Sequence, residues 1–128
     1  MALVLLYNIP KGEKLRRIKV ALMRQGLPCR EVSSSEYGHP IGYLAGLEGF
    51  GPAEEYTGQG FGAEMLVMSG LTQRQFNGLL DGLRASRAGV ALKAVITEHN
   101  AAWDSVALYQ ALQEEHDTMR ELLEAKRK

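Results

Sequence analysis

Two polar segments of this sequence hold the residue types best suited to bind a small ligand. Ser69 and Gly70 precede a helical pattern that begins near Thr72, and free backbone N–H groups at such a turn bind anions such as phosphate. Lys11 follows the first apolar segment in a similar way and would add a positive charge. The polar residues after the last predicted strand form a second cluster. Together they predict a weak site for a small anionic ligand, formed by Asn8, Lys11, Ser69, Gly70, Thr72, Thr97, His99 and Asn100.

The sequence lacks the established signatures of catalysis and metal binding. No serine stands in a G-x-S-x-G elbow, and there is no H-E-x-x-H, C-x-x-C or G-x-x-x-x-G-K-[ST] motif. The glycines from Gly58 to Gly62 precede a strand-like segment, whereas a dinucleotide-binding fingerprint follows a strand. His39, Glu98 and His99 are interpreted as turn residues rather than metal ligands. We therefore expect no metal and no cofactor, leave any catalytic residue unknown, and favour a protein that is not an enzyme.

Hydrophobic periodicity predicts the elements that must position these side chains. Short apolar runs indicate strands, and apolar residues three and four positions apart indicate helices. Thr72 with Gln75 resembles a capping box, and Asp104 is a suitable N-cap for the last helix. Strands are predicted at 3–7, 29–33, 65–68 and 90–97, and helices at 11–25, 39–47, 72–89 and 104–125.

The alternation of these elements predicts a single α/β domain over residues 1–128, with a small, mostly parallel four-stranded sheet. Two strand-helix-strand-helix halves, at about 1–48 and 64–128, are joined by a glycine-rich loop at 49–63, expected to be a flexible surface loop. The expected strand order 2-1-3-4 would bring the carboxyl ends of all four strands to one edge. Lys93 indicates that the fourth strand lies at the side of the sheet. A ferredoxin-like α+β fold, in which strands two and three pair, is the alternative.

The two halves also agree residue by residue at an offset of 61, which indicates an internal duplication. Each matched pair consists of two apolar residues at corresponding points of a strand or helix. The pairs are Leu5 with Leu66, Leu15 with Phe76, Ile18 with Leu79, Leu22 with Leu83, and Leu47 with Leu108.

Fifteen basic and fifteen acidic residues cancel, so no net field favours nucleic acid or an anionic membrane as the partner. The distribution is uneven, because residues 1–30 carry seven basic side chains and one acidic one, whereas residues 31–64 carry six glutamates and no basic residue. Lys14, Arg17 and Arg24 can share one face of the first predicted helix. A solvated face is the simplest interpretation, and contact with RNA or an acidic partner is the alternative.

The composition favours a cytoplasmic protein that does not enter a membrane. The single cysteine, Cys29, has no intramolecular disulfide partner and suits a reducing compartment, where it is interpreted as a small core residue. No segment approaches the roughly 20 apolar residues of a membrane span. The first seven residues lack the pattern of a secretory signal.

The final predicted helix, of about 22 residues at 1.5 Å each, is longer than is needed to cover four strands. Apolar and aromatic residues recur along it at spacings of three and four, as in a coiled-coil seam. This seam predicts a homodimer, with Tyr109, Leu112, His116, Met119 and Leu123 at the interface.

The second half of the chain carries a characteristic combination of segments. These are Met65 to Thr72 with Leu79 and Leu80, Ala91 to Thr97, Asn100, Trp103, and Leu112 to His116. Over about residues 64–117 the chain resembles a family of small bacterial domains of unknown function. The resemblance implies a bacterial, cytoplasmic protein and transfers no activity, cofactor or catalytic residue. It draws attention to Lys93, Thr97, Asn100 and Trp103, at and after the predicted fourth strand.

Three functions remain open from the sequence alone. The first is a non-enzymatic binding, regulatory or protein-interaction module that forms a homodimer through its last helix. The second is a small enzyme or binder that acts on an anionic metabolite at the carboxyl edge of the sheet, with Lys11, His99 and Asn100 as participants. The third is an RNA-binding module that uses the basic first helix.

Overall fold

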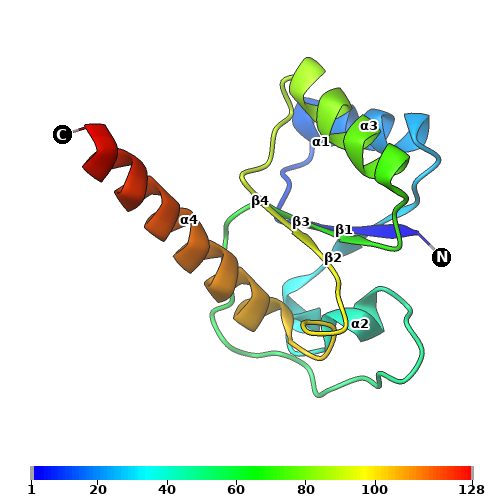
Figure 1. Ribbon diagram of the computed structural model, residues 1–128. Helices are drawn as coiled ribbons and strands as arrows, with labels where there is room; N and C mark the ends of the chain where they lie inside the picture. Colours follow the sequence, from blue (N-terminus) through cyan, green and yellow to red (C-terminus); the bar gives the residue numbers. More distant parts are fainter. Residues whose placement is uncertain (1, 128) are drawn as a thin grey trace.

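The computed structural model describes residues 2–127 and consists of one mixed four-stranded sheet with helices on both faces (Figure 1). The strands are β1 (Leu3–Tyr7), β2 (Cys29–Val32), β3 (Met65–Ser69) and β4 (Leu92–Val95). Their order is β2-β1-β3-β4, which confirms the predicted α/β class and strand order. Because β2 and β3 are not neighbours, the ferredoxin-like alternative is wrong.

The central pair of strands is antiparallel, whereas β1 with β2 and β3 with β4 are parallel. Leu3 lies opposite Ser69, and Tyr7 lies opposite Met65, so β3 starts at the edge where β1 ends. The Asn8 side chain holds the chain at that edge, because its Nδ2 donates to the carbonyls of Phe61 and Ala63 at 3.0 Å. The sheet is therefore mostly parallel, with one antiparallel pair at its centre.

Both crossover helices lie on one face of the sheet as a consequence of this pairing. These are α1 (Glu13–Arg24) and α3 (Gln73–Ala85), which run side by side above the strands in Figure 1. Right-handed crossovers in an all-parallel sheet of this order would place the two helices on opposite faces. Turning β3 and β4 around brings α3 to the same side as α1, where Ile18, Leu22, Leu79 and Leu83 form a common core with Leu66.

The opposite face of the sheet is covered by α2 (Ile41–Leu44), α4 (Ser105–Arg127) and the long connection between β2 and β3. A 3₁₀ turn at Ser34–Glu36 precedes α2, which is shorter than the helix predicted at 39–47. Beginning with Ser105 and Leu108, the amino-terminal half of α4 packs on the sheet, while its carboxyl-terminal half extends away from the molecule (Figure 1).

Local signals set the helix ends. Thr72 accepts a hydrogen bond from the Gln75 backbone N–H at 3.1 Å, and the Gln75 side chain accepts one from the Thr72 N–H, which confirms the predicted capping box. The carboxylate of Asp104 accepts a bond from the Ala107 N–H and caps α4 as predicted. Gly26, with φ +67°, ends α1 in the left-handed conformation that glycine favours.

The glycine-rich loop at 49–63 packs against an aromatic cluster. The Phe61 ring stacks on Tyr37 with centroids 4.7 Å apart and on Tyr109 of α4 at 4.4 Å. Gly60 has φ +65°, and a Cβ atom there would lie 2.8 Å from the Tyr37 ring, so only glycine fits this approach. The expected flexible loop is therefore anchored to the sheet face by its own side chains.

The predicted duplication fits α1 and α3 at an offset of 61 and the strands at 62, but α2 and α4 begin 64 positions apart. Leu47 lies after the end of α2 and outside the core, whereas Leu108 is buried in α4, so these two residues do not correspond. Leu5 lies in the core on the α4 face, whereas Leu66 lies in the core on the α1 face, so their predicted match is wrong by one residue. Val67 shares the face of Leu5. A shift of one residue moves a strand side chain to the opposite face, which apolar composition alone does not reveal.

Candidate functional site

The carboxyl ends of the four strands, which were expected at one edge of the sheet, lie at two opposite edges. Because β1 and β3 are antiparallel, Asn8 and Lys11 follow β1 at one edge, whereas Ser69 and Gly70 follow β3 at the other. The prediction that all four carboxyl ends meet is wrong for this reason. Thr72, Thr97, His99 and Asn100 lie at the β3–β4 edge, and Lys11 is on the other side of the molecule from them.

Asn8 has a structural role at the first edge. It adopts φ 58°, donates to the two loop carbonyls and accepts a bond from the Tyr37 hydroxyl at 3.1 Å, so each polar atom of its side chain is engaged. Burial raises the pKa of the Tyr37 hydroxyl, although its bond to Asn8 opposes that shift. Lys11 is exposed in the turn before α1. The residues at this edge thus tie the loop to the sheet.

The β3–β4 edge carries a groove of about 520 Å³. Ser69 is buried at the end of β3, and Gly70 follows it with φ +72°. The charged residues that line this groove are Glu48 and Glu98, and no basic residue lines it. Two carboxylates in the lining disfavour an anion there, and the groove suits an apolar or hydrogen-bonding group.

The remaining predicted ligand residues at this edge form a turn. Thr97 donates its backbone N–H to the Asn100 side-chain oxygen at 2.8 Å, and the Asn100 amide donates to the Val95 carbonyl at 3.1 Å. His99 is exposed, with its ring 5.5 Å from that of Trp103. Thr97 and Asn100 therefore shape the exit of β4 and turn the chain toward α4.

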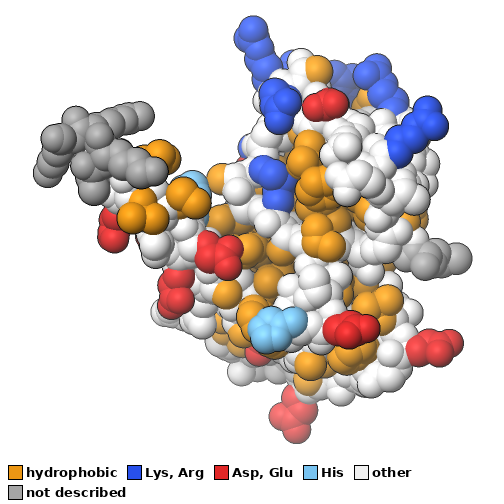
Figure 2. Space-filling view, viewed as in Figure 1, with side chains coloured by type: hydrophobic (Ala, Val, Ile, Leu, Met, Phe, Trp, Pro, Cys, Tyr) orange, Lys and Arg blue, Asp and Glu red, His pale blue; other side chains and the backbone are white. Residues whose placement is uncertain are grey.

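Positive charge is concentrated in the layer formed by α1 and α3. Residues 11–24 and 73–88 hold nine of the fifteen basic residues of the chain but two of its fifteen acidic residues, Glu13 and Asp81. Figure 2 shows these basic side chains gathered over the two helices, with acidic side chains on the opposite part of the molecule and along α4. The uneven distribution along the sequence thus becomes a separation of charge between the two faces of the sheet.

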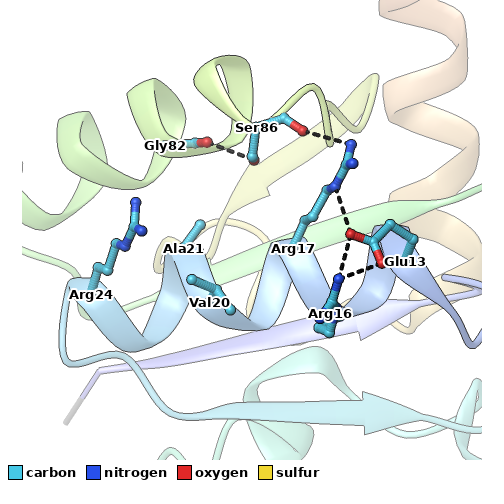
Figure 3. A pocket seen from close by; sticks show the side chains of 8 residues that line it. All are labelled: Glu13, Arg16, Arg17, Val20, Ala21, Arg24, Gly82 and Ser86. Carbon is cyan, nitrogen blue, oxygen red and sulfur yellow. Dashed lines mark hydrogen bonds and ion pairs between the residues drawn. The ribbon is translucent and has the colours of Figure 1, made fainter.

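A groove of about 200 Å³ runs between α1 and α3 within this basic layer (Figure 3). Its floor consists of small residues, because a Cβ atom on Gly82 would lie 3.4 Å from the Ala21 Cβ. Arg17 and Arg24 extend from α1 toward α3, with Val20 and Ala21 between them (Figure 3). The lining residues are Glu13, Arg16, Arg17, Val20, Ala21, Arg24, Gly82 and Ser86.

Ion pairs hold part of this groove in place. Glu13 accepts hydrogen bonds from Arg16 at 2.6 and 2.7 Å and from Arg17 at 3.2 Å, and these bonds lower the pKa of the Glu13 carboxyl. Arg17 also donates to the Ser86 carbonyl at 3.2 Å, which joins α1 to the end of α3. Among the residues that the structure describes, Arg24 takes part in no ion pair. The groove therefore carries an exposed guanidinium that no carboxylate of the described residues neutralises.

Sequence reasoning found part of this groove. Of the three basic residues assigned to one helix face, Arg17 and Arg24 line the groove, whereas Lys14 pairs with Glu64 beside β3. The small residues that form the floor were missed. Their signal is the spacing Gly78-x-x-x-Gly82, since both glycines face α1 and a Cβ atom on Gly78 would overlap the Gln25 side chain.

The predicted dimer seam is divided between two environments. Tyr109 and Leu112 are partly buried and pack against the sheet core. His116 is exposed beside Asp117 and Arg120. Met119 and Leu123 are each more than half exposed on the extended part of α4, and so is Leu122.

Lys93 lies on β4 at the side of the sheet, as predicted. Its ammonium group donates to the Val90 carbonyl, and its pKa is lowered by burial and by the nearby Arg84. Cys29 packs against the core on the α1 face, in agreement with a core role. Within residues 2–127, no cluster of histidine, cysteine and carboxylate side chains has the form of a metal site, and no helix is long and apolar enough to cross a membrane.

Comparison with known proteins bears on the second half of the chain. No curated protein shows significant similarity to the sequence. A family model described as "Domain of unknown function (DUF3783)" matches residues 64–119, from the end of the glycine-rich loop to the exposed part of α4. That segment contains β3, α3, β4 and most of α4, and thus one wall of the groove. Residues 64–119 of this chain are a match to DUF3783, an uncharacterised domain family.

Proposed function

We propose that this chain is a non-enzymatic protein-interaction module that binds an acidic, amphipathic helix in the groove between α1 and α3. The observation that carries the proposal is the row of Arg16, Arg17 and Arg24 along a groove whose floor is made of Ala21 and Gly82. Two parallel or antiparallel helices leave a channel on their outer side, and small residues let a third helix approach closely. Apolar anchors on the bound helix would meet Val20, and its carboxylates would meet the arginines.

The lining of the groove favours a protein helix over RNA. None of its eight lining residues is aromatic, whereas modules that bind single-stranded RNA stack bases on aromatic side chains. Its floor is apolar and narrow, which suits aliphatic side chains better than a phosphate backbone. The experiment below therefore compares binding of a helical peptide with binding of RNA.

The test measures the binding of a designed acidic, amphipathic helical peptide to the full chain by fluorescence anisotropy. The test variant is Arg16→Gln with Arg17→Gln and Arg24→Gln, and the matched control is Arg74→Gln with Arg84→Gln and Arg87→Gln, which removes the same charge from the same layer outside the groove. We expect the test variant to weaken binding roughly tenfold or more and the control to change it by less than about threefold. Equal losses in both variants, or tighter binding of single-stranded RNA than of the peptide, would contradict the proposal.

The proposal includes three further properties predicted from the sequence. The resemblance and the single cysteine support a bacterial, cytoplasmic protein. The one domain over residues 1–128 is proposed to descend from a duplication, which the contact between Ala21 and Gly82 supports, because these residues are equivalent at an offset of 61. A homodimer is also part of the proposal.

A small anionic ligand at the carboxyl edge of the sheet is the weaker candidate. Gly70 and Thr72 provide the turn that this ligand would need. Glu48 and Glu98 line the same groove and oppose an anion there, and Lys11 belongs to the other edge. A phosphate-dependent rise in melting temperature that survives Lys11→Ala and is lost in Thr72→Val would favour this candidate.

A further inference from the structure

The outer half of α4, residues 113–124, carries exposed acidic and apolar side chains of the kind that the groove between α1 and α3 would bind. Residues 113–124 contain five acidic residues and one basic residue, Arg120, and the basic residues Lys126 and Arg127 follow at the end of the helix. Met119 and Leu122 lie three positions apart on one side of the helix, and Glu115 precedes Met119 by one turn. This segment is therefore an acidic, amphipathic helix with its apolar stripe exposed.

Most of the exposed large apolar side chains lie on α1 or on the outer half of α4. In the part of the chain that the structure describes, six large hydrophobic side chains are exposed. Val20 lines the groove, Met23 lies on α1 outside the groove lining, three belong to the outer half of α4, and the sixth is Val95 on β4. Surfaces that carry both complementary charge and exposed apolar side chains are typical of interaction sites.

The outer half of α4 cannot reach the groove of its own chain. The groove lies on the face of the sheet that α1 and α3 cover, whereas α4 packs on the opposite face through Leu108, Tyr109 and Leu112 (Figure 1). The sheet stands between them, and α4 is a continuous helix from Ser105 to Arg127. Contact between these complementary surfaces therefore requires two molecules.

We propose that the groove between α1 and α3 binds the outer half of α4 from a second copy of this chain. This inference rests on the proposed function and names the occupant of the same site. Glu114 and Glu115 meet Arg17 and Arg24 of the other copy, and Met119 and Leu122 pack on Val20. A reciprocal exchange of the two α4 helices gives a closed dimer, whereas a one-way contact gives an open chain of molecules.

Charge exchange between two full-length variants tests the pairing directly. Variant one carries Arg17→Glu and Arg24→Glu in the groove, and variant two carries Glu114→Arg and Glu115→Arg on α4. Matched controls are Arg84→Glu with Arg87→Glu, outside the groove, and Asp117→Arg with Glu124→Arg, on the other side of α4. Sedimentation velocity over a concentration series measures self-association of each protein and of a one-to-one mixture of the two test variants.

We expect the wild-type chain to self-associate, more weakly at high salt because the paired charges are screened. The dissociation constant of self-association should rise roughly tenfold or more in each test variant alone. In each control it should stay within about threefold of the wild-type value. The mixture should regain association, because glutamates in one groove then meet arginines on the other α4. Recovery in the mixture cannot arise from misfolding of either variant.

The outcomes separate this inference from the proposed function. A wild-type chain that stays monomeric while the acidic peptide still binds the groove overturns the second copy as occupant and leaves the protein-interaction role intact. Self-association that persists in both test variants, or a mixture that does not recover, also overturns the inference. A wild-type chain that neither binds the peptide nor self-associates contradicts both proposals.

Discussion

Ala21 of α1 and Gly82 of α3 meet at the floor of the groove, where a Cβ atom on Gly82 would lie 3.4 Å from the Ala21 Cβ. This distance is an ordinary van der Waals contact, so an alanine at position 82 fits without moving α1. The contact holds the two helices close together and leaves room above them. The arginines on α1 then line an open channel instead of covering a larger side chain.

Gly82→Ala should therefore preserve the fold and raise its stability. Alanine favours a helix interior over glycine by about 1 kcal/mol, and nothing in the groove opposes the added methyl group. Urea unfolding measures the change. A loss of more than about 1 kcal/mol would mean that α1 and α3 approach each other more closely than described.

Gly60→Ala should destabilise the protein by about 2 kcal/mol or more. The left-handed backbone at φ +65° disfavours alanine, and the new Cβ atom would lie 2.8 Å from the Tyr37 ring. The matched control is Gly62→Ala in the same loop, where a Cβ atom meets nothing within 4 Å. Equal thermal stability of the two variants would show that the loop does not pack on Tyr37.

Asn8→Asp should loosen the glycine-rich loop and lower stability by about 1–3 kcal/mol. The substitution keeps the size of the side chain but removes the donor that bonds the carbonyls of Phe61 and Ala63. Asn77→Asp, on the exposed side of α3, is the control. Hydrogen exchange should become faster in the loop in the Asn8 variant, and unchanged exchange there would contradict this role.

Stability should fall as the pH rises from 10 to 12. Burial raises the pKa of the Tyr7 hydroxyl from 10.0 to about 12, although its 2.7 Å bond to Ser105 opposes the shift. The unfolded chain therefore releases this proton first, and the contribution of neutral Tyr7 is complete below pH 10 and lost as the pH approaches 12. A shift of this size corresponds to about 3 kcal/mol.

Tyr7→Phe isolates that contribution. The variant should be less stable at neutral pH by about 1–3 kcal/mol, because Ser105 loses its buried partner. Its stability should then decline less steeply above pH 10 than that of the wild-type chain. The control is Tyr43→Phe, at a half-buried tyrosine beside His39. An identical alkaline decline in Tyr7→Phe and the wild-type chain would exclude Tyr7 as the titrating group.

The sequence predicts the elements of this fold well because their signals are local. Thr72 with Gln75, and Asp104 alone, define helix starts through hydrogen bonds to residues three positions ahead. Lys93 indicates an edge strand through its own chemistry. Each of these features depends on a few consecutive residues.

The direction of β3 could not be predicted in this way. A strand buried on both faces is a continuous apolar run whether its neighbours are parallel or antiparallel, so Leu66 and Val67 carry no information about direction. The direction is a property of the pairing of β3 with β1, which joins residues about 60 positions apart. The shared face of α1 and α3, and with it the groove, follows from that antiparallel pairing.

The central claim is that the groove between α1 and α3 binds an acidic helix. An NMR titration of the full chain with the acidic helical peptide tests this claim most directly. The account predicts that the backbone amide signals of Val20, Ala21, Gly82 and Ser86 shift together and saturate, while those of Gly70 and Thr97 stay in place. Shifts centred on Gly70 and Thr97, or spread evenly over the basic surface without saturation, would contradict it.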